Sequence, residues 1–423
     1  MGVFFYNIFL LLFKAGAYLS APFNKKAKKW LQGRRNIFEK LEAAIPADAK
    51  IIWMHCASLG EFEQGRPVIE QLRIQHPSYR ILLTFFSPSG YEVRKNYDGA
   101  DWVFYLPMDG PRNARRFLEI THPELVIFVK YEFWYYYLKK IKYRNIPLLL
   151  ISALFRKDMS FFQWYGGLQR KILSRFDHLF VQNESSKKLV EEIELGPICS
   201  VSGDTRFDRV IEIADHFQPI APIENFVGNS KVIVAGSTWP EDEEVLQKAL
   251  AHLENTDLKL IIAPHEINEK HLADIEKLFP HSIRFSQLPT HDSRLTTPDS
   301  LQTLIVDNIG MLSRLYKYAW ITYIGGGMKP SGIHNVLEAA VYDKIVLFGP
   351  YYKKYSEAIG LVQSGGGISF SNETELAQAL QLVLQDKNTY DEKSAASGRF
   401  VQSHKGATQK ILNYIQEKRL LTN

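Results

Sequence analysis

Cysteine is almost absent from this chain of 423 residues, which has only Cys56 and Cys199. Two cysteines build neither a disulfide framework nor a zinc-binding pattern, so we expect a reducing, cytoplasmic setting for the main body and no metal. A strong charge of one sign is also missing, because the formal net charge is +5. With 46% hydrophobic and 23% charged residues, the composition is that of a folded globular protein.

Long apolar runs are confined to the N-terminus, where residues 3–23 are mostly apolar and Lys14 interrupts them. No basic region precedes this segment and no A-x-A-like site follows it, which argues against a secretory signal. A dense basic window comes next: Lys25, Lys26, Lys28, Lys29, Arg34 and Arg35. We expect residues 1–23 to anchor the chain at a cytoplasmic membrane face, with these cations near anionic headgroups. The alternative is a helix packed on the protein's own core.

Nucleic acid is not an expected partner, since the only dense basic patch adjoins this apolar segment. Beyond residue 50, short apolar runs alternate with amphipathic helical patterns. This alternation predicts parallel strands covered by helices on both faces. The expected strands are 51–55, 81–85, 125–129, 148–151 and 178–181, then 231–235, 258–263, 304–307, 320–324 and 345–348.

The length and a proline-containing break divide the chain into domains. We expect an anchor at 1–23, a Rossmann-like domain at 24–217, a linker at 218–230 and a second Rossmann-like domain at 231–423 with C-terminal helices. The predicted fold class is α/β, with two doubly wound domains facing a central cleft where ligands bind.

A glycine loop in the second domain carries the most information. Gly325, Gly326 and Gly327 follow a predicted buried strand and precede a helix start, which is typical of an anion cradle of backbone N–H groups. His334, Asn335 and Glu338 are expected on the first helical turn. The spacing matches neither G-x-G-x-x-G nor a P-loop.

Other candidates also follow predicted strands. Ser58, Gly60 and Glu61 come after the first strand, where Glu61 is either a catalytic carboxylate or only a favourable helix-start charge. Arg206, in the stretch Gly203 to Asp208, is either an anion contact or part of a polar hinge.

Two further segments of the second domain fit the same position. Ser237 and Thr238 read as helix N-caps, as phosphate contacts, or as both. His265 suits a nucleotide contact better than a metal ligand, because no third ligand has zinc-like spacing. In the first domain, Glu132 lies within an aromatic run that is either core or a stacking surface.

Taken in their order along the chain, these motifs resemble those of the Kdo transferases, which attach 3-deoxy-D-manno-octulosonic acid (Kdo) to a lipid A precursor. The resemblance rests on Ser58-Leu59-Gly60-Glu61, Tyr105 to Asp109, Glu132-Phe133-Trp134, Gly203 to Asp208, Gly236-Ser237-Thr238, Asp307 to Gly310 with Tyr316, and Gly332 to Glu338. One departure is Ala263-Pro264-His265, where the family commonly has Pro-Arg-His.

The resemblance implies a GT-B glycosyltransferase of lipopolysaccharide biosynthesis at the inner membrane, inverting and without a metal or cofactor. Its implied partners are CMP-Kdo, the lipid A precursor and the membrane. Glu61 is then the general base and Glu338 contacts ribose, while the remaining residues are expected to bind substrate: Ser58, Gly60, Glu132, Arg206, Ser237, Thr238, His265, Asp307, Gly326, Gly327, His334 and Asn335. The alternatives are a GT-B transferase using a UDP-sugar and a lipid-linked acceptor, or a non-catalytic nucleotide-binding membrane protein.

Overall fold

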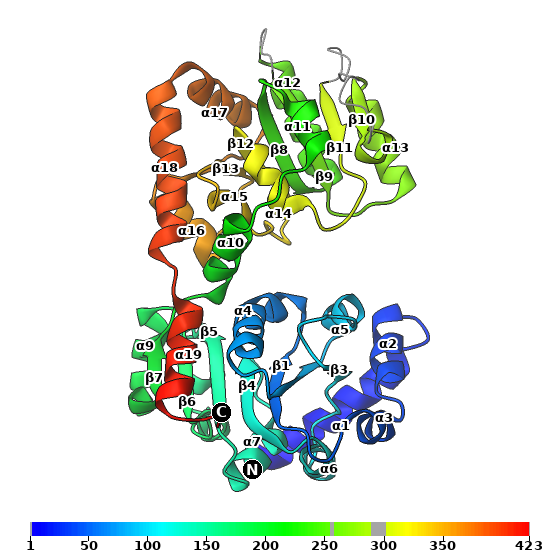
Figure 1. Ribbon diagram of the computed structural model, residues 1–423, viewed down its shortest axis with the longest axis vertical. Coiled ribbons are helices and arrows are strands. Elements are labelled where there is room, and N and C mark those ends of the chain that lie inside the picture. Colours follow the sequence, from blue (N-terminus) through cyan, green and yellow to red (C-terminus); the bar gives the residue numbers. More distant parts are fainter. Residues whose placement is uncertain (1, 254–257, 289–301, 423) are drawn as a thin grey trace. The chain divides into compact units, whose positions relative to one another are not determined.

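The chain forms two compact units, each built on its own sheet (Figure 1). The structure is a computed structural model that describes residues 2–253, 258–288 and 302–422. Unit 1 comprises Met1–Asp208 and Lys405–Asn423, and unit 2 comprises Arg209–His404. The N-terminal segment is a helix, α1 (Gly2–Ser20), that belongs to unit 1.

The sheet of unit 1 has seven strands, and every neighbouring pair is parallel. Its order is β3 (Trp102–Tyr105), β2 (Arg80–Phe85), β1 (Ile51–Cys56), β4 (Pro123–Val129), β5 (Leu148–Ala153), β6 (His178–Val181) and β7 (Cys199–Val201). Helices α2 (Lys25–Gly33) and α3 (Ile37–Ala44) precede β1. The helices that connect the strands are α4 (Leu59–Gln75), α5 (Pro88–Arg94), α6 (Pro111–Thr121), α7 (Tyr135–Tyr143), α8 (Gly167–Leu173) and α9 (Glu184–Glu191).

The sheet of unit 2 repeats this parallel arrangement. Its order is β10 (Ser282–Arg284), β11 (Thr303–Ile305), β9 (Leu258–Pro264), β8 (Lys231–Thr238), β12 (Ile321–Ile324), β13 (Ile345–Phe348) and β14 (Gly367–Ser369). Its helices are α11 (Ala221–Val227), α12 (Pro240–Ala251), α13 (Glu269–Leu278), α14 (Leu312–Leu315), α15 (Leu337–Ala340), α16 (Ser356–Gln363), α17 (Glu373–Gln385) and α18 (Lys387–Ser403). Helix α10 (Thr205–Asp215) crosses the boundary between the units.

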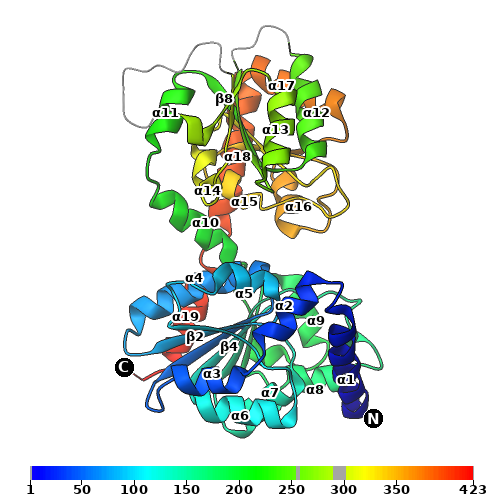
Figure 2. The same cartoon turned by 90° about the vertical axis from the view of Figure 1, so that its right-hand side faces the viewer.

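Alternation along the strands creates two apolar layers in unit 1. Ile51 and Trp53 of β1 pack into one core cluster, while Ile52 and Met54 pack into the other, because successive side chains point to opposite faces. Helices cover both faces (Figure 2), so the central strands are fully buried. This burial explains why the inner strands read as continuous apolar runs.

The strands that the sequence did not predict are the sheet edges: β3, β7, β10 and β14. Each has three or four residues and is partly exposed, so it lacks the long apolar run of a buried strand.

Helix α19 (Ala407–Glu417) differs from the expected domain organisation. The predicted second domain extended to residue 423, whereas Ile411, Leu412 and Ile415 of α19 belong to a core cluster of unit 1. The Asp208 carboxylate accepts the N–H groups of Gly406 at 2.5 Å and Thr408 at 2.6 Å, where α19 begins. Similarly, the expected linker 218–230 contains α11, whose Ile223 and Phe226 are fully buried.

Candidate active site

In both units, the sheet order reverses beside its first strand. Strands β2 and β4 flank β1 in unit 1, and β9 and β12 flank β8 in unit 2. At such a point, neighbouring crossover connections lie on opposite faces and leave a crevice at the carboxyl ends of the strands. Most residues singled out in the sequence lie in the segments that follow these strands, whereas Arg206 follows β7 and Asp307 follows β11.

Glu61 lies in the first turn of α4, just beyond β1. Its carboxylate accepts the backbone N–H groups of Ala57 and Ser58. Burial, and then the charge of Glu132, raise the pKa of Glu61 to about 8, although the Ala57 amide and Lys130 act in the opposite direction. A carboxylate in this range is suited to accept a proton near neutral pH.

Glu132 is 7% exposed and forms a bonded cluster at the end of β4. Its Oε2 lies 2.7 Å from His55 Nε2 and accepts the Trp134 indole N–H at 2.5 Å. The other ring nitrogen of His55 lies 2.8 Å from Thr84 Oγ1. The structure therefore brings Glu132 beside Glu61, with one carboxylate oxygen already bonded. The sequence did not assign His55 or Trp134 a role, since only the fold joins β1 to the aromatic segment.

The other candidate residues of unit 1 are Ser58, Gly60 and Arg206, of which only Arg206 has a side-chain partner among the described residues. Ser58 is the N-cap residue of α4, but its hydroxyl makes no capping bond. Gly60 has open space where a Cβ would project. Arg206 pairs with the buried Asp204 carboxylate at 2.7 Å, which orients its guanidinium at the start of α10.

The glycine loop of unit 2 corrects one expectation. Its amides were expected to face a ligand, but Gly325 N–H donates to Gly236 O at 2.9 Å and Gly326 N–H to Asp242 Oδ2 at 2.8 Å. Asp242 also accepts the Tyr323 hydroxyl at 3.0 Å. The loop therefore does cradle an anion, but that anion is the protein's own buried carboxylate.

The helix start after β8 also differs from the N-cap prediction. Trp239, rather than Ser237 or Thr238, is the N-cap residue of α12, and its N–H donates to Asp242 Oδ2 at 2.9 Å. The fully buried Thr238 hydroxyl donates to Glu243 at 2.7 Å. Ser237 has a φ of 55°, in the left-handed region, so the strand ends in a sharp change of direction.

Three aromatic rings meet beyond the carboxyl ends of β8, β9 and β12. His265 stacks on His334 with 4.4 Å between ring centroids, and its ring lies 4.7 Å from that of Trp239. Burial, and then the neighbouring His265, lower the pKa of His334 to about 4, so its imidazole is neutral at physiological pH. The cluster places His265 and His334 side by side beyond these strand ends, a position consistent with the predicted contact between His265 and a nucleotide.

Asn335 and Glu338 lie together, as the sequence predicted, but the helix begins later. Helix α15 starts at Leu337, so His334 and Asn335 precede it instead of forming its first turn. The Asn335 side chain donates to Glu338 at 3.0 Å and accepts the Leu337 N–H at 3.1 Å. Asp307, after β11, is held by the Ser286 N–H at 3.0 Å and the Ser286 hydroxyl at 2.5 Å.

The N-terminal helix α1 is fastened to unit 1 by polar contacts. The Tyr6 hydroxyl donates to Asp109 at 2.6 Å, and the Tyr136 hydroxyl donates to Asn7 at 2.8 Å. The buried Asp109 also accepts the Tyr136 and Tyr137 amides, which links α1 to the start of α7. By length and composition, α1 could also cross a membrane.

Comparisons with known proteins agree with this fold. The family model described as 3-deoxy-D-manno-octulosonic-acid transferase matches residues 31–209. A relative named 3-deoxy-D-manno-octulosonic acid transferase from Aquifex aeolicus is 29% identical over 83% of this chain and 92% of its own length. One of the same name from Rickettsia felis is 28% identical, over 86% and 78% respectively.

Solved structures show the same two-unit architecture. A UDP-GlcNAc 2-epimerase from Neisseria meningitidis has a TM-score of 0.58 at 16% identity, covering 87% of this chain and all of that one. A glycosyltransferase from Rickettsia africae has a TM-score of 0.56 at 14% identity, covering 89% and 100%. The fold is GT-B-like, and over most of its length the chain is similar to 3-deoxy-D-manno-octulosonic acid transferases, a group of glycosyltransferases.

Proposed function

We propose that this protein transfers Kdo from CMP-Kdo to a lipid A precursor at the cytoplasmic face of the inner membrane, in lipopolysaccharide biosynthesis. The similarity to 3-deoxy-D-manno-octulosonic acid transferases supports the reaction class. The single observation that carries the mechanism is the Glu61 carboxylate, whose pKa is raised by burial and by Glu132 at the carboxyl end of β1.

In the proposed step, Glu61 removes the proton of the acceptor hydroxyl while the oxygen of that hydroxyl attacks C2 of Kdo. The new bond between this oxygen and C2 forms while the bond between C2 and the phosphate oxygen breaks, and CMP leaves with that electron pair. Attack opposite the leaving group inverts the anomeric centre, and the reaction is proposed to need no metal. Glu132, held by His55 and Trp134, keeps Glu61 basic enough to take the proton.

Unit 2 is proposed to hold the donor. Its stacked His265 and His334 offer an aromatic surface and ring nitrogens to the nucleotide, and Glu338 is assigned to the ribose hydroxyls. Ser237 and Gly327 remain proposed phosphate contacts. Gly326 and Thr238 are better assigned to shaping this region, because Asp242 already accepts the Gly326 amide and Glu243 accepts the fully buried Thr238 hydroxyl.

Membrane association is proposed to occur through α1 lying in the interface. One face of this helix is bonded to unit 1, and the opposite face exposes large apolar side chains, including Phe4 at 66%, Leu11 at 70% and Leu12 at 67%. A helix that exposes apolar side chains while docked along its own protein suits an in-plane anchor.

The test is to incubate the purified protein with CMP-Kdo and tetraacylated disaccharide, following both CMP release and the mass of the lipid. We expect a heavier lipid from the parent, no product from Glu61→Ala, and product from the matched control Glu63→Ala on the same helix. Added chelator should leave the rate unchanged. Turnover only with a UDP-sugar, or CMP binding with no transfer, would contradict the proposal.

A further inference from the structure

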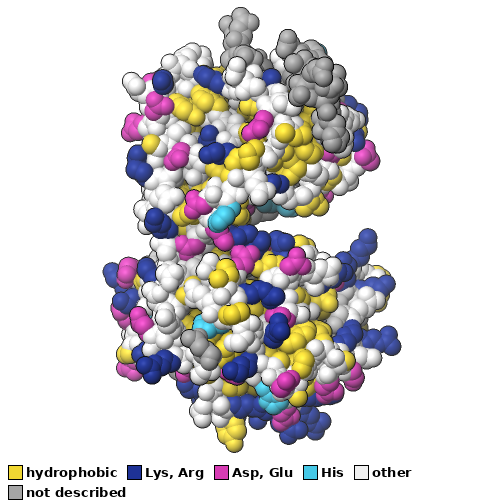
Figure 3. All heavy atoms as spheres, in the orientation of Figure 1, with side chains coloured by type: hydrophobic (Ala, Val, Ile, Leu, Met, Phe, Trp, Pro, Cys, Tyr) yellow, Lys and Arg dark blue, Asp and Glu magenta, His cyan; other side chains and the backbone are white. Residues whose placement is uncertain are grey.

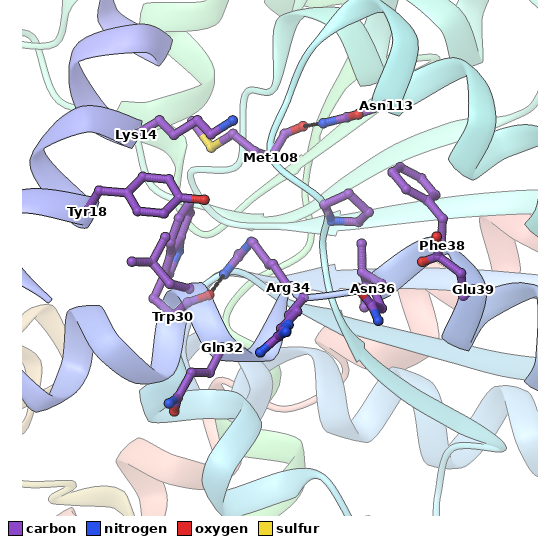
Figure 4. A pocket seen from close by; sticks show the side chains of 14 residues that line it. Lys14, Tyr18, Trp30, Gln32, Arg34, Asn36, Phe38, Glu39, Met108 and Asn113 are labelled. Carbon is purple, nitrogen blue, oxygen red and sulfur yellow. Dashed lines mark hydrogen bonds between the residues drawn. The ribbon is translucent and has the colours of Figure 1, made fainter.

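A pocket of about 620 Å³ lies in unit 1, and Glu61 is not among the residues that line it. Its walls come from α1, from α2, α3 and the turn between them, and from the segment between β3 and α6 together with the start of α6. In Figure 4, Lys14 and Tyr18 extend from α1 into the space that Arg34 and Asn36 border. Lys14 is the one charged residue in the sequence of α1, so the helix turns its single charge toward this pocket.

The charge lining the pocket is predominantly positive. Lys14, Arg34 and Arg35 line it, against a single carboxylate, Glu39. Within the described part of the chain, no carboxylate lies at ion-pair distance from these three cations. A group of unpaired cations around one cavity favours an anionic ligand.

Arg34 is fixed in place without using an acidic partner. Its guanidinium donates to the carbonyl oxygens of Leu106 at 2.9 Å, Trp30 at 3.2 Å and Phe86 at 2.8 Å, and it lies 4.0 Å from the Trp30 ring. These neutral groups orient the side chain and leave its positive charge uncompensated. A partly buried cation held in this way is stabilised when an anion enters beside it.

Trp30 provides a second, independent observation. Its side chain lines the same pocket and the residue is 7% exposed, yet its indole N–H finds no acceptor among the described residues. Buried donors are almost always paired in folded proteins, so one residue that lines the pocket carries a donor that the protein itself leaves unsatisfied.

The surroundings indicate where an anionic ligand comes from. Exposed apolar residues of α1, including Leu11, Leu12 and Leu19, lie on the helix that forms one wall. Lys and Arg side chains also gather over α2 and α6 of the same unit (Figure 3). A ligand with acyl chains beside α1 and an anionic head in the pocket satisfies both features.

We propose that this pocket binds the phosphate headgroup of an anionic bilayer phospholipid through Lys14, Arg34 and Arg35. The proposal rests on the membrane association proposed above, and it adds a specific headgroup site to the diffuse attraction of the basic window. Bound in this way, the lipid fixes how α1 is seated in the interface.

The test uses the full-length protein in detergent mixed with phosphatidylcholine and phosphatidylglycerol, and native mass spectrometry counts the phosphatidylglycerol retained. The pocket variant is Lys14→Gln/Arg35→Gln, two exposed positions that leave Arg34 and its contacts in place. The matched control is Lys25→Gln/Lys28→Gln, which removes the same charge from α2 without altering the pocket.

We expect the parent and the control to retain one phosphatidylglycerol, and the pocket variant to lose it with a drop in affinity of about tenfold or more. Equal retention by all three proteins, or equal loss in both variants, overturns the proposal. A raised KM for the disaccharide acceptor in the pocket variant also overturns it, because the pocket then serves the acceptor's own anionic group. Lipid retention needs no donor and no turnover, so this result stands apart from any failure of the transferase assay.

Discussion

Replacing Glu61 by Gln should make the protein more stable at alkaline pH while abolishing its activity. A carboxylate that is costly to ionise in the folded state contributes stability only while it is protonated. Its folded pKa of about 8 lies above the ordinary value of 4.5, so between these values the folded state holds a proton that the unfolded state has released. The free energy of unfolding therefore falls as pH rises through this window.

The size of the effect follows from the shift. A difference between 4.5 and about 8, at about 1.36 kcal/mol per unit, amounts to at most about 5 kcal/mol lost between these pH values. Glutamine keeps an oxygen that can accept the Ala57 N–H, and it carries no charge. The variant should therefore lack this slope and unfold at higher urea than the parent at pH 9, by an amount on the order of 2 M.

The assay is urea unfolding followed by tryptophan emission across this pH range. Because two compact units need not unfold together, Trp239→Phe and Trp320→Phe are introduced in all proteins, which leaves only the tryptophans of unit 1. The control is Glu63→Gln, on the same helix as Glu61, which removes the negative charge that pairs with Arg94 of α5 at 2.9 Å and should keep the parent's slope. The reasoning is refuted if Glu61→Gln keeps that slope or is less stable than the parent at pH 9.

Three further changes test other parts of the structure. Glu132→Gln removes the like charge beside Glu61, so the acid limb of kcat/KM should move to lower pH by about one unit; no movement, or a rise, contradicts this. Asp208→Ala removes the acceptor of two α19 amides and should cost about 1–2 kcal/mol, seen as faster hydrogen exchange in 407–417; unchanged protection contradicts it. Gly326→Ala places a Cβ 2.6 Å from Gly332 O at a φ of 87°, so calorimetry should show unit 2 destabilised by about 1–3 kcal/mol and CMP binding weakened, whereas Gly60→Ala, with open space, should melt like the parent.

The buried framework could be predicted from the sequence because local pattern determines it. Every inner strand of both sheets was predicted, since a strand covered on both faces needs an uninterrupted apolar run. The edge strands were missed because a short, partly exposed strand that pairs on one side only does not need an uninterrupted apolar run. Helix α19 was expected as a helix, but no local pattern tells which unit its apolar face will cover.

The candidate site was predictable where a residue follows a strand, and less so where its partner is distant in sequence. Glu61 and His265 lie at strand ends, as the pattern indicated. The pairing of Glu132 with His55 depends on β1 and β4 being neighbours, which only the sheet order determines. The Asp242 carboxylate, which takes the amide of Gly326, is 84 residues away from it. The sequence shows that Asp242 falls in the first turn of the helix after β8, but it does not show that Asp242 bonds to Gly326 after β12.

The return of α19 to unit 1 has a consequence for how the protein is made. During synthesis the seven strands of unit 1 leave the ribosome before unit 2, whereas α19, which completes the core of unit 1, follows the whole of unit 2. Until α19 arrives, apolar side chains of α4 such as Val68, Ile69 and Leu72 lack part of their cover. Unit 2 is continuous in sequence, so it can fold while unit 1 still lacks the helix that completes its core.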